Sequence, residues 1–195
     1  MTGASSGLGV ETARALTAAG ADVTLAVRNV ATGDAVAQTI EKSTGANRPH
    51  VFRLDLADLD CVTHFVEMWG GPLHLLVNNA GLVTGGVATG LQRNFTARQR
   101  ESLDAAEATG VFSYKTVEQG AATTIVAAVA PQFARTGGHY LDDGREAYTV
   151  ANAAELARHP HGVKQWALDP ESATRLWLVS ADLTGRLAYR GTADR

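Results

Sequence analysis

Residues 1–9 read Met-Thr-Gly-Ala-Ser-Ser-Gly-Leu-Gly and lead directly into a helical run. That run, residues 10–19 (VETARALTAA), favours a helix and places Ala13, Leu16 and Ala19 along one face. Glycines let a backbone approach a ligand closely, and the first turn of a helix offers unpaired N–H groups and a positive dipole end. The stretch therefore predicts a seat for a dinucleotide pyrophosphate. The alternative is a Gly/Ser-rich tail that happens to precede a helix.

A buried strand is expected next. Gly20 ends the helix, and residues 21–27 (ADVTLAV) are an apolar, β-branched run typical of a parallel strand. The order of glycine loop, helix, strand and polar strand end is that of the Rossmann fold. At this strand end an acidic residue binds the ribose 2′-OH of NAD, whereas an arginine accommodates the 2′-phosphate of NADP. Arg28 favours NADP over NAD, although a solvated cation is the plainer interpretation.

Two further motifs close predicted strands. Asp55-Leu56 follows the strand at 50–54, and Asn78-Asn79-Ala80-Gly81 follows the strand at 73–77. With the segment 2–9, these motifs resemble the T-G-x-x-x-G-x-G, adenine-pocket and N-N-A-G motifs of the short-chain dehydrogenase/reductase family. The amino-acid sequence of these segments is most similar to that of the family's retinol-dehydrogenase-like branch. The resemblance implies an NAD(P)-dependent oxidoreductase that transfers hydride between a carbonyl and an alcohol.

The expected fold class is α/β, with a truncated Rossmann-type, doubly wound and mainly parallel sheet flanked by helices. A single domain is predicted over 1–195, with a cofactor-binding part at 1–83, a lid and C-terminal part at 84–185, and a tail at 186–195. Only Met1 precedes the glycine loop, so the family's first strand is expected to be missing. Its loss would leave two strand edges with unpaired backbone groups, unless the strands close up, a partner supplies the strand, or the chain is a fragment.

The resemblance also implies a set of cofactor contacts. The segment 85–91 (GGVATGL) resembles the family's stretch after the sixth strand, in which a threonine contacts the nicotinamide carboxamide. The predicted cofactor-binding residues are Gly3, Ser5, Ser6, Gly7, Leu8, Gly9, Arg28, Asn29, Asp55, Leu56, Asn79, Ala80, Gly81 and Thr89.

The family's catalytic residues are not found by motif. Its Tyr-x-x-x-Lys places phenol and ammonium on one helix face, where the ammonium favours phenolate. Here the residues four positions after Tyr114, Tyr140, Tyr148 and Tyr189 are Glu118, Gly144, Asn152 and Thr192. Lys115 directly follows Tyr114, but adjacent residues of a helix do not share a face.

The missing residues point to an internal gap. Leu82-Val83 fits the end of strand four and Thr84 the end of strand six, so roughly three βα units of about 30 residues are expected to be missing between them. Whether the chain is an enzyme stays open. It is either an oxidoreductase that is impaired or inactive, or a non-catalytic dinucleotide-binding or partner-binding remnant of the family.

Composition limits the remaining choices. With 45% hydrophobic and 19% charged residues and a net charge of −3, the 195-residue chain is typical of a globular domain and not of a nucleic-acid binder. The absence of a long apolar run predicts no membrane span, and the single cysteine favours a cytoplasmic location. The expected partners are a small carbonyl or alcohol substrate and, by resemblance, further copies in a homo-oligomer. No metal site is expected, because His159 and His161 lack a ligand pattern.

Several further elements are expected. Arg93, Arg98 and Arg100 either steer an anionic substrate or form a solvated helix face. Helices are expected at 58–68, 91–108, 116–130 and 169–183, with a short final strand at 137–141.

Overall fold

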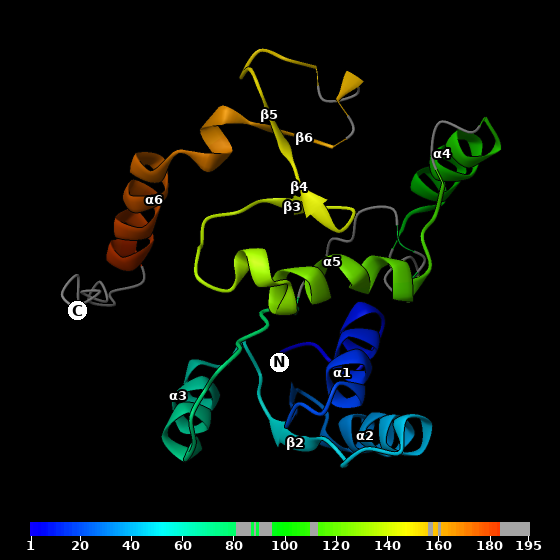
Figure 1. The fold of residues 1–195 in the computed structure, drawn as a ribbon, viewed down its shortest axis with the longest axis vertical. Coiled ribbons are helices and arrows are strands. Elements are labelled where there is room, and N and C mark those ends of the chain that lie inside the picture. Colours follow the sequence, from blue (N-terminus) through cyan, green and yellow to red (C-terminus); the bar gives the residue numbers. More distant parts are fainter. Residues whose placement is uncertain are drawn as a thin grey trace. The chain divides into compact units, whose positions relative to one another are not determined.

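The computed structural model describes residues 1–80, 87, 89, 95–109, 113–155, 158–159 and 161–183. The chain forms two compact units, Met1–Ala134 and Arg135–Arg195 (Figure 1). The first unit holds the predicted cofactor motifs, and it is of the α/β class. The prediction of a single domain with parts at 1–83, 84–185 and 186–195 stays a prediction.

Unit 1 alternates helices and strands in its first half and is helical in its second half. Its elements are α1 (Leu8–Ala18), β1 (Thr24–Val27), α2 (Val30–Thr44), β2 (His50–Arg53), α3 (Leu59–Met68), α4 (Ala97–Ala108), α5 (Val117–Val129) and the 3-10 helix η2 (Pro131–Phe133). β1 and β2 pair in parallel, with Thr24 opposite His50 and Val27 opposite Arg53. This is the βαβ unit that the order of motifs predicts.

The chain's first two residues occupy the other edge of β1. The backbone N–H of Ala26 donates to the Met1 carbonyl at 2.9 Å, and Thr2 forms a parallel bridge with Ala26. On its far side the Thr2 N–H donates to the Val77 carbonyl at 3.0 Å. Met1 and Thr2 therefore lie where the family's first strand is expected, between β1 and the segment that contains Val77.

The strand predicted at 73–77 does not form, and that prediction is wrong. Leu73, Leu75 and Leu76 are 55%, 41% and 57% exposed in irregular backbone. The Thr2 N–H bonds to the Val77 carbonyl, but no described strand pairs with residues 73–76. Their apolar pattern therefore has neither a ladder partner nor a covering layer in the described residues.

The main core of unit 1 lies on one face of the sheet. Leu25 and Val27 of β1 pack with the apolar stripes of α1 and α2, in a cluster completed by Ala4, Ala13, Leu16, Val23, Ala37 and Ile40. A Cβ at Gly33 would come within 2.8 Å of the Val27 and Val51 side chains, so α2 needs glycine there to pack this closely. The core thus joins α1, α2 and the sheet.

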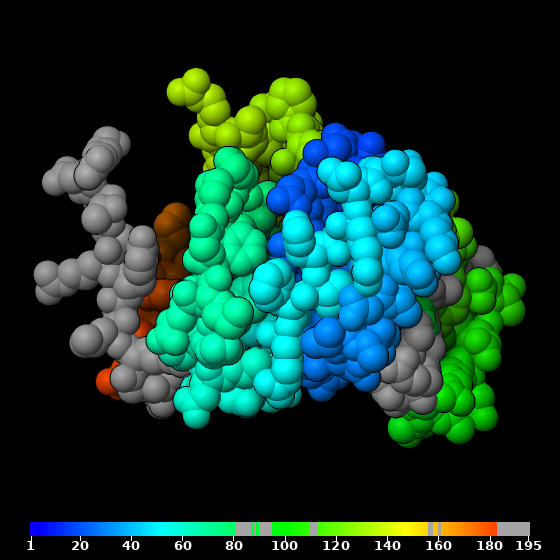
Figure 2. Space-filling model, turned by 90° about the horizontal axis from the view of Figure 1, so that it is seen from below, coloured from blue at the N-terminus to red at the C-terminus, as the bar shows by residue number. Residues whose placement is uncertain are grey.

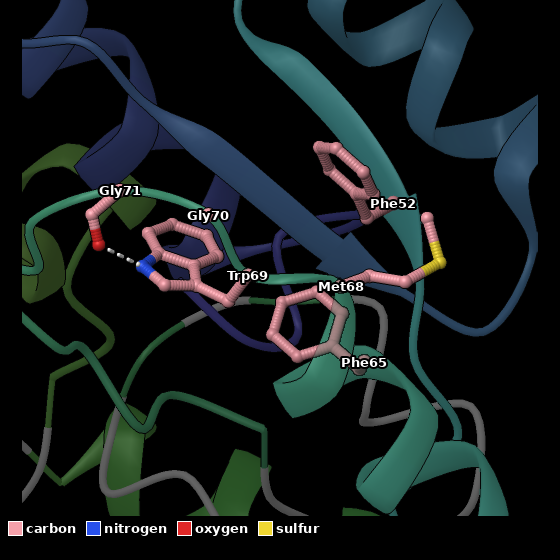
Figure 3. Close-up of a pocket in the computed structure, with 6 residues that line it drawn as sticks. All are labelled: Phe52, Phe65, Met68, Trp69, Gly70 and Gly71. Carbon is pink, nitrogen blue, oxygen red and sulfur yellow. Dashed lines mark hydrogen bonds between the residues drawn. The ribbon is translucent and has the colours of Figure 1, made fainter.

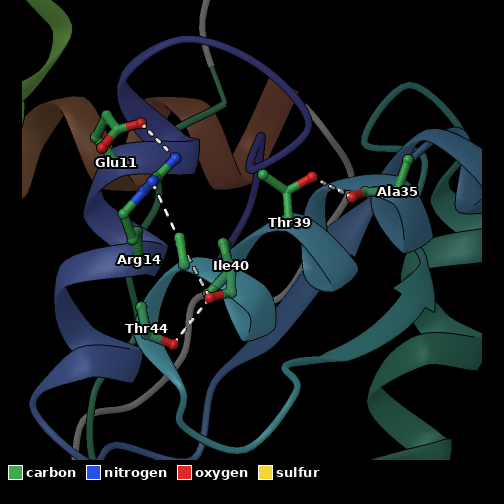
Figure 4. A network of polar contacts seen from close by, with 7 residues as sticks. Glu11, Arg14, Ala35, Thr39, Ile40 and Thr44 are labelled. Atoms are coloured by element: carbon green, nitrogen blue, oxygen red, sulfur yellow. Dashed lines mark hydrogen bonds and ion pairs between the residues drawn. The ribbon is translucent and has the colours of Figure 1, made fainter.

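Polar contacts join the same two helices. Arg14 of α1 pairs with Glu11 at 3.0 Å and donates to the Ser43 hydroxyl of α2 at 3.3 Å. The hydroxyls of Ser43 and Thr44 donate in turn to the Ile40 carbonyl (Figure 4). The Arg14–Ser43 bond joins the middle of α1 to the end of α2, and the Arg14 guanidinium balances the charge of Glu11.

Helix boundaries follow caps more than apolar patterns. α1 begins at Leu8 instead of residue 10, and the helix expected at 91–108 begins at Ala97, because Thr96 and Gln99 form a capping box. A second box, formed by Thr116 and Gln119, starts α5, which ends before Pro131. The predicted helix at 116–130 is therefore confirmed within one residue at each end.

Unit 2 has short strands and one long helix. Its elements are β3 (Leu141–Asp142), β4 (Arg145–Glu146), β5 (Tyr148–Val150), β6 (Gly162–Lys164), the 3-10 helix η4 (Gln165–Leu168) and α6 (Pro170–Leu183). β3 and β4 pair as a hairpin, and β5 and β6 pair in parallel. Asp143 and Gly144 form the hairpin turn, with positive φ values of 51° and 71°. The expected strand at 137–141 is wrong except at Leu141, because the chain pairs only on either side of this turn.

Candidate functional site

The predicted motifs meet at the carboxyl edge of the sheet. The glycine loop follows Thr2, Arg28 follows β1, Asp55 lies just beyond β2, and Asn79 follows the segment that bonds to Thr2. Parallel segments whose carboxyl ends lie side by side form the edge at which Rossmann folds bind their ligands.

Thr2 links the glycine loop to the Asn-Asn-Ala motif. Its hydroxyl oxygen accepts hydrogen bonds from the backbone N–H groups of Asn79 and Ala80, both at 3.1 Å. The Asn79 side-chain amide donates back to the carbonyls of Thr2, at 3.2 Å, and Gly3, at 3.1 Å. Thr2 is missing from the predicted site residues. The sequence signal for it is the threonine that directly precedes the first glycine of the motif.

Glycines at positions 3 and 9 are required by this close approach. A Cβ on Gly3, whose φ is 65°, would lie 2.7 Å from the Ala80 Cα. A Cβ on Gly9 would overlap the Gly3 carbonyl oxygen and lie 2.6 Å from the Asn79 amide nitrogen. Both distances are far below van der Waals contact, so these glycines shape the loop by admitting residues 79 and 80.

The remaining glycine of the loop, Gly7, directly precedes α1, and the start of α1 differs from the starts of the other α-helices. Gly7, with φ 58°, is the N-cap of α1 and provides no side-chain hydrogen bond to the first turn. In the described chain, α2 to α5 are each capped by an Asn, Asp or Thr side chain, and the Asp169 carboxylate accepts from the Ser172 N–H at the start of α6. No side chain therefore caps the first turn of α1, in which the Val10 N–H donates to the Gly7 carbonyl at 3.1 Å, and a helix start without a side-chain cap is what an anion seat requires.

Thr89 lies against this helix start. A Cβ on Gly7 would be 3.4 Å from the Thr89 Cβ and Cγ2 atoms. Nearby, a Cβ on Gly120 of α5 would come within 2.8 Å of the buried Val87 side chain and would also meet Leu8 Cδ2. Leu8 therefore directs its side chain to α5, and only its backbone can face a phosphate. The structure thus brings Thr89, Gly7 and Leu8 together from segments far apart in sequence.

The remaining predicted residues vary in exposure. Ser6 is exposed and Ser5 half-buried in the loop. Arg28 is exposed beyond β1, and Asn29 caps α2 by accepting from the Thr32 N–H at 3.1 Å. Gly81 lies outside the described residues.

Beyond β2, Asp55 makes local contacts. Its carboxylate accepts from the Ala57 N–H at 3.1 Å, and its own N–H donates to the Cys61 sulfur at 3.3 Å. Leu56 is 50% exposed, so an adenine ring would find it open at this strand end. Cys61 is half-buried, and its sulfur accepts from the Asp55 N–H and from the Arg53 guanidinium, so it serves as an acceptor within the fold.

Tyr114 and Lys115 lie directly before α5, outside the helix, and Lys115 forms a parallel bridge with Val87. The pair therefore does not form the arrangement of Tyr-x-x-x-Lys on one helix face. In unit 2, the Tyr148 hydroxyl lies 3.5 Å from His159 Nδ1, and Tyr140 is exposed. Tyr189 lies outside the described residues.

The described residues contain no cluster of metal-ligating side chains. No group of three or more His, Cys, Asp or Glu residues there is placed to hold a metal ion. His161 Nδ1 lies 2.8 Å from one carboxylate oxygen of Asp142. The described helices also include none that is long and apolar enough to cross a membrane.

Comparison with known proteins identifies the family. The model of the short chain dehydrogenase family matches residues 1–116 of the 195. A probable oxidoreductase of Streptomyces lividans is 27% identical over 287 aligned positions, which cover 93% of this chain and 95% of the relative. Retinol dehydrogenase 11 of Mus musculus is 42% identical over 86 residues, covering 43% of this chain and 27% of that protein.

A solved structure is also similar. A short-chain dehydrogenase from Sphingobium yanoikuyae in complex with NADPH is 30% identical, with a TM-score of 0.36, over 68% of this chain and 47% of that one. The family match covers more than half of this chain, and it includes the glycine loop and the Asn-Asn-Ala motif. The chain therefore belongs to the short chain dehydrogenase family, a family of oxidoreductases that use nicotinamide dinucleotides.

Proposed function

We propose that this chain binds NADP, in preference to NAD, at the carboxyl edge of its sheet. The observation that carries the proposal is the start of α1, where the family's glycine motif leaves the first turn without a side-chain cap. A pyrophosphate would accept hydrogen bonds from the N–H groups of this turn. Gly3 and Gly9 support the proposal, because they allow residues 79 and 80 to fix the loop beside it.

The other strand ends would hold the rest of the dinucleotide. Arg28 is exposed beyond β1, where its guanidinium would pair with a 2′-phosphate. Asp55 and Leu56 would border the adenine, and Thr89 would meet the nicotinamide side, where the dinucleotide supplies or accepts a hydride. A small carbonyl or alcohol is the proposed substrate class.

We further propose that hydride transfer by this chain is impaired or absent. The family chemistry needs a phenol held beside an ammonium on one helix face, whereas Tyr114 and Lys115 are adjacent residues outside α5. A gap in the sequence supports the same view. The alignment with the Streptomyces lividans protein has 287 positions, so at least 92 of them have no residue of this 195-residue chain opposite. A cytoplasmic location remains a prediction.

Calorimetric titration with NADPH and NADH tests the nucleotide proposal. We expect saturable, one-to-one binding that is tighter for NADPH. Arg28→Asp should remove this preference, because it replaces the cation with a group that accepts from a 2′-OH. Arg48→Asp is the matched control, since Arg48 lies beyond the end of α2 and pairs with Asp34 within that helix. No binding by the folded wild-type chain would refute the proposal.

A rate measurement distinguishes an impaired enzyme from a non-catalytic nucleotide-binding protein. NADPH oxidation should be followed with a panel of aldehydes and ketones at high protein concentration. We expect no turnover above background in the same sample that binds NADPH. Turnover that is retained in Tyr114→Phe and lost in Tyr148→Phe would contradict this expectation and assign the phenol to unit 2.

A further inference from the structure

Helix α3 is attached to unit 1 along β2. Every residue of α3 is at least partly exposed, and Figure 2 shows the helix at the surface beside β2 (cyan to teal). Toward the end of the helix, the Phe65 ring meets the Phe52 ring of β2 edge to face, with the ring centroids 6.2 Å apart and the ring planes at 83° (Figure 3). In the first turn, the Cys61 sulfur makes a polar contact with the end of β2. An aromatic contact and a polar contact thus join α3 to this strand.

The Cys61 sulfur lies between two donors from the end of β2. It accepts from the Asp55 N–H at 3.3 Å and from the Arg53 guanidinium at 3.4 Å. Cys61 itself is fixed by the helix cap, because the Asp58 carboxylate accepts from the Asp60 and Cys61 N–H groups, both at 3.1 Å. The sulfur is therefore held from the helix side, and it can in turn hold the strand end.

The backbone of Asp55 lies just beyond the ladder between β1 and β2. That ladder ends at Leu54, whose N–H donates to the Val27 carbonyl at 2.8 Å. Because successive N–H groups of a strand point to opposite sides, the Asp55 N–H points away from β1, where β2 has no described strand as a neighbour. The Cys61 sulfur is the acceptor that this N–H meets. Without the sulfur, the backbone of Asp55 would be free to turn.

The Asp55 carboxylate has an oxygen that a ligand can reach. Its Oδ1 atom accepts from the Ala57 N–H at 3.1 Å, and among the described residues its Oδ2 atom accepts no hydrogen bond. A carboxylate oxygen can accept from the exocyclic amino group of adenine, whereas hypoxanthine has a carbonyl oxygen in place of that amino group. The proposed site puts the adenine at Asp55 and Leu56. The orientation of this carboxylate would therefore determine whether the amino group is recognised.

We propose that Cys61 is a positioning residue for the adenine end of the nucleotide site. By accepting from the Asp55 N–H, its sulfur fixes the backbone from which the Asp55 carboxylate meets the adenine amino group. Cys61 touches no part of the nucleotide in this arrangement, and it acts only through Asp55. The inference rests on the proposed binding of NADP, and it adds a residue that determines how adenine is distinguished from another purine.

Calorimetric titrations with NADPH and with its hypoxanthine analogue test this role. The wild-type chain should bind NADPH about tenfold more tightly, because the analogue lacks a hydrogen bond to a charged acceptor. Cys61→Ala should lower this affinity ratio to about threefold or less, whereas Cys61→Ser, which keeps an acceptor, should stay within about twofold of the wild-type ratio. Phe65→Leu is the matched control. It loosens the aromatic contact between α3 and β2 but keeps the sulfur, so its ratio should equal that of the wild type.

The outcomes separate this inference from the proposed function. A wild-type chain that binds both nucleotides equally well, or a Cys61→Ala variant that keeps the full preference, overturns the role of Cys61 and leaves NADP binding in place. A ratio that falls as far in Cys61→Ser or in Phe65→Leu as in Cys61→Ala also overturns it, because the acceptor would then not be the cause. A wild-type chain that binds neither nucleotide refutes the proposed function and this inference together.

Hydrogen exchange provides a measurement that needs no nucleotide. The Asp55 N–H, followed by NMR, should exchange faster in Cys61→Ala than in the wild-type chain, because it loses its acceptor. In Phe65→Leu its exchange rate should stay close to that of the wild type. Equal exchange rates in Cys61→Ala and the wild-type chain would show that the sulfur does not hold this N–H, and they would overturn the proposal.

Discussion

Single residues of unit 1 determine whether the loop before α1 can form. Gly3 and Gly9 have no room for a Cβ, and the atoms that would be displaced belong to the backbone and to Asn79. The loop is thus shaped from the protein side as much as from the ligand side. The sequence predicted that these glycines matter, but it assigned them to phosphate contact. Their role against Ala80 and Asn79 needs a contact 70 residues away, which local spacing does not encode.

Gly9→Ala should therefore destabilise unit 1. The new methyl group would force the loop apart and weaken both Asn79 hydrogen bonds, at a cost of about 1–3 kcal/mol or more. NADPH affinity should fall at least about tenfold, which is 1.4 kcal/mol. Urea unfolding and NADPH titration measure the two effects. Gly137→Ala is the control, since no atom lies within 4 Å of a Cβ there. Equal behaviour of the two variants would show that the loop is not tightly packed.

Among the elements, helices were easier to predict than strands. Helix starts such as Asp58 and Thr116 are written locally, in caps that need only neighbouring residues. Residues 73–77 have a strand pattern, but a strand also needs a neighbour, and among the described residues only Val77 bonds to one, at Thr2. The Met1 amino group lies beside β1. The Met1 ammonium donates to the Thr24 carbonyl at 2.9 Å.

Stability should depend on the charge of this amino group. Burial lowers the pKa of the Met1 amino group below its usual 8.0, so the folded state favours the neutral form. Its contribution to stability is therefore fully present above pH 8 and declines as the pH falls below that value. Acetylation removes the charge but keeps an N–H for Thr24. Urea unfolding between about pH 6.5 and pH 8.5 should show a flatter profile for the acetylated chain, and identical profiles would refute the argument.

At the scale of the whole molecule, apolar surface is unevenly used. The buried cluster of unit 1 has eight residues, five of them alanine or valine, whereas large side chains such as Trp69 and Leu76 remain exposed. The fold class was predictable, because glycine loop, helix and strand follow one another in the sequence. The exposure of one side of the sheet was not predictable, because it depends on which other segments pack against that side and not on the local sequence pattern.

A core this small should tolerate little loss. Leu25 is fully buried at its centre, and Leu25→Ala should cost about 2–5 kcal/mol, a large part of the 5–15 kcal/mol typical of a folded domain. Leu178→Ala, at a residue that is 54% exposed on α6, should change stability by no more than about 0.5 kcal/mol. Thermal and urea unfolding compare the two. A small effect of Leu25→Ala would mean that the cluster is not the centre of stability.

The bonds between Thr2 and Asn79 also bear on how the protein matures. They join positions 77 residues apart, and contacts of such separation form slowly because a long loop must close first. In a chain still leaving the ribosome, α1 would be exposed well before residues 79 and 80, which fix the loop in front of it, have been made. The proposed nucleotide would bind only chains in which residues 79 and 80 have been made and packed against the glycine loop, and it would stabilise those chains by mass action. Nucleotide supply would then raise the share of newly made protein that survives quality control.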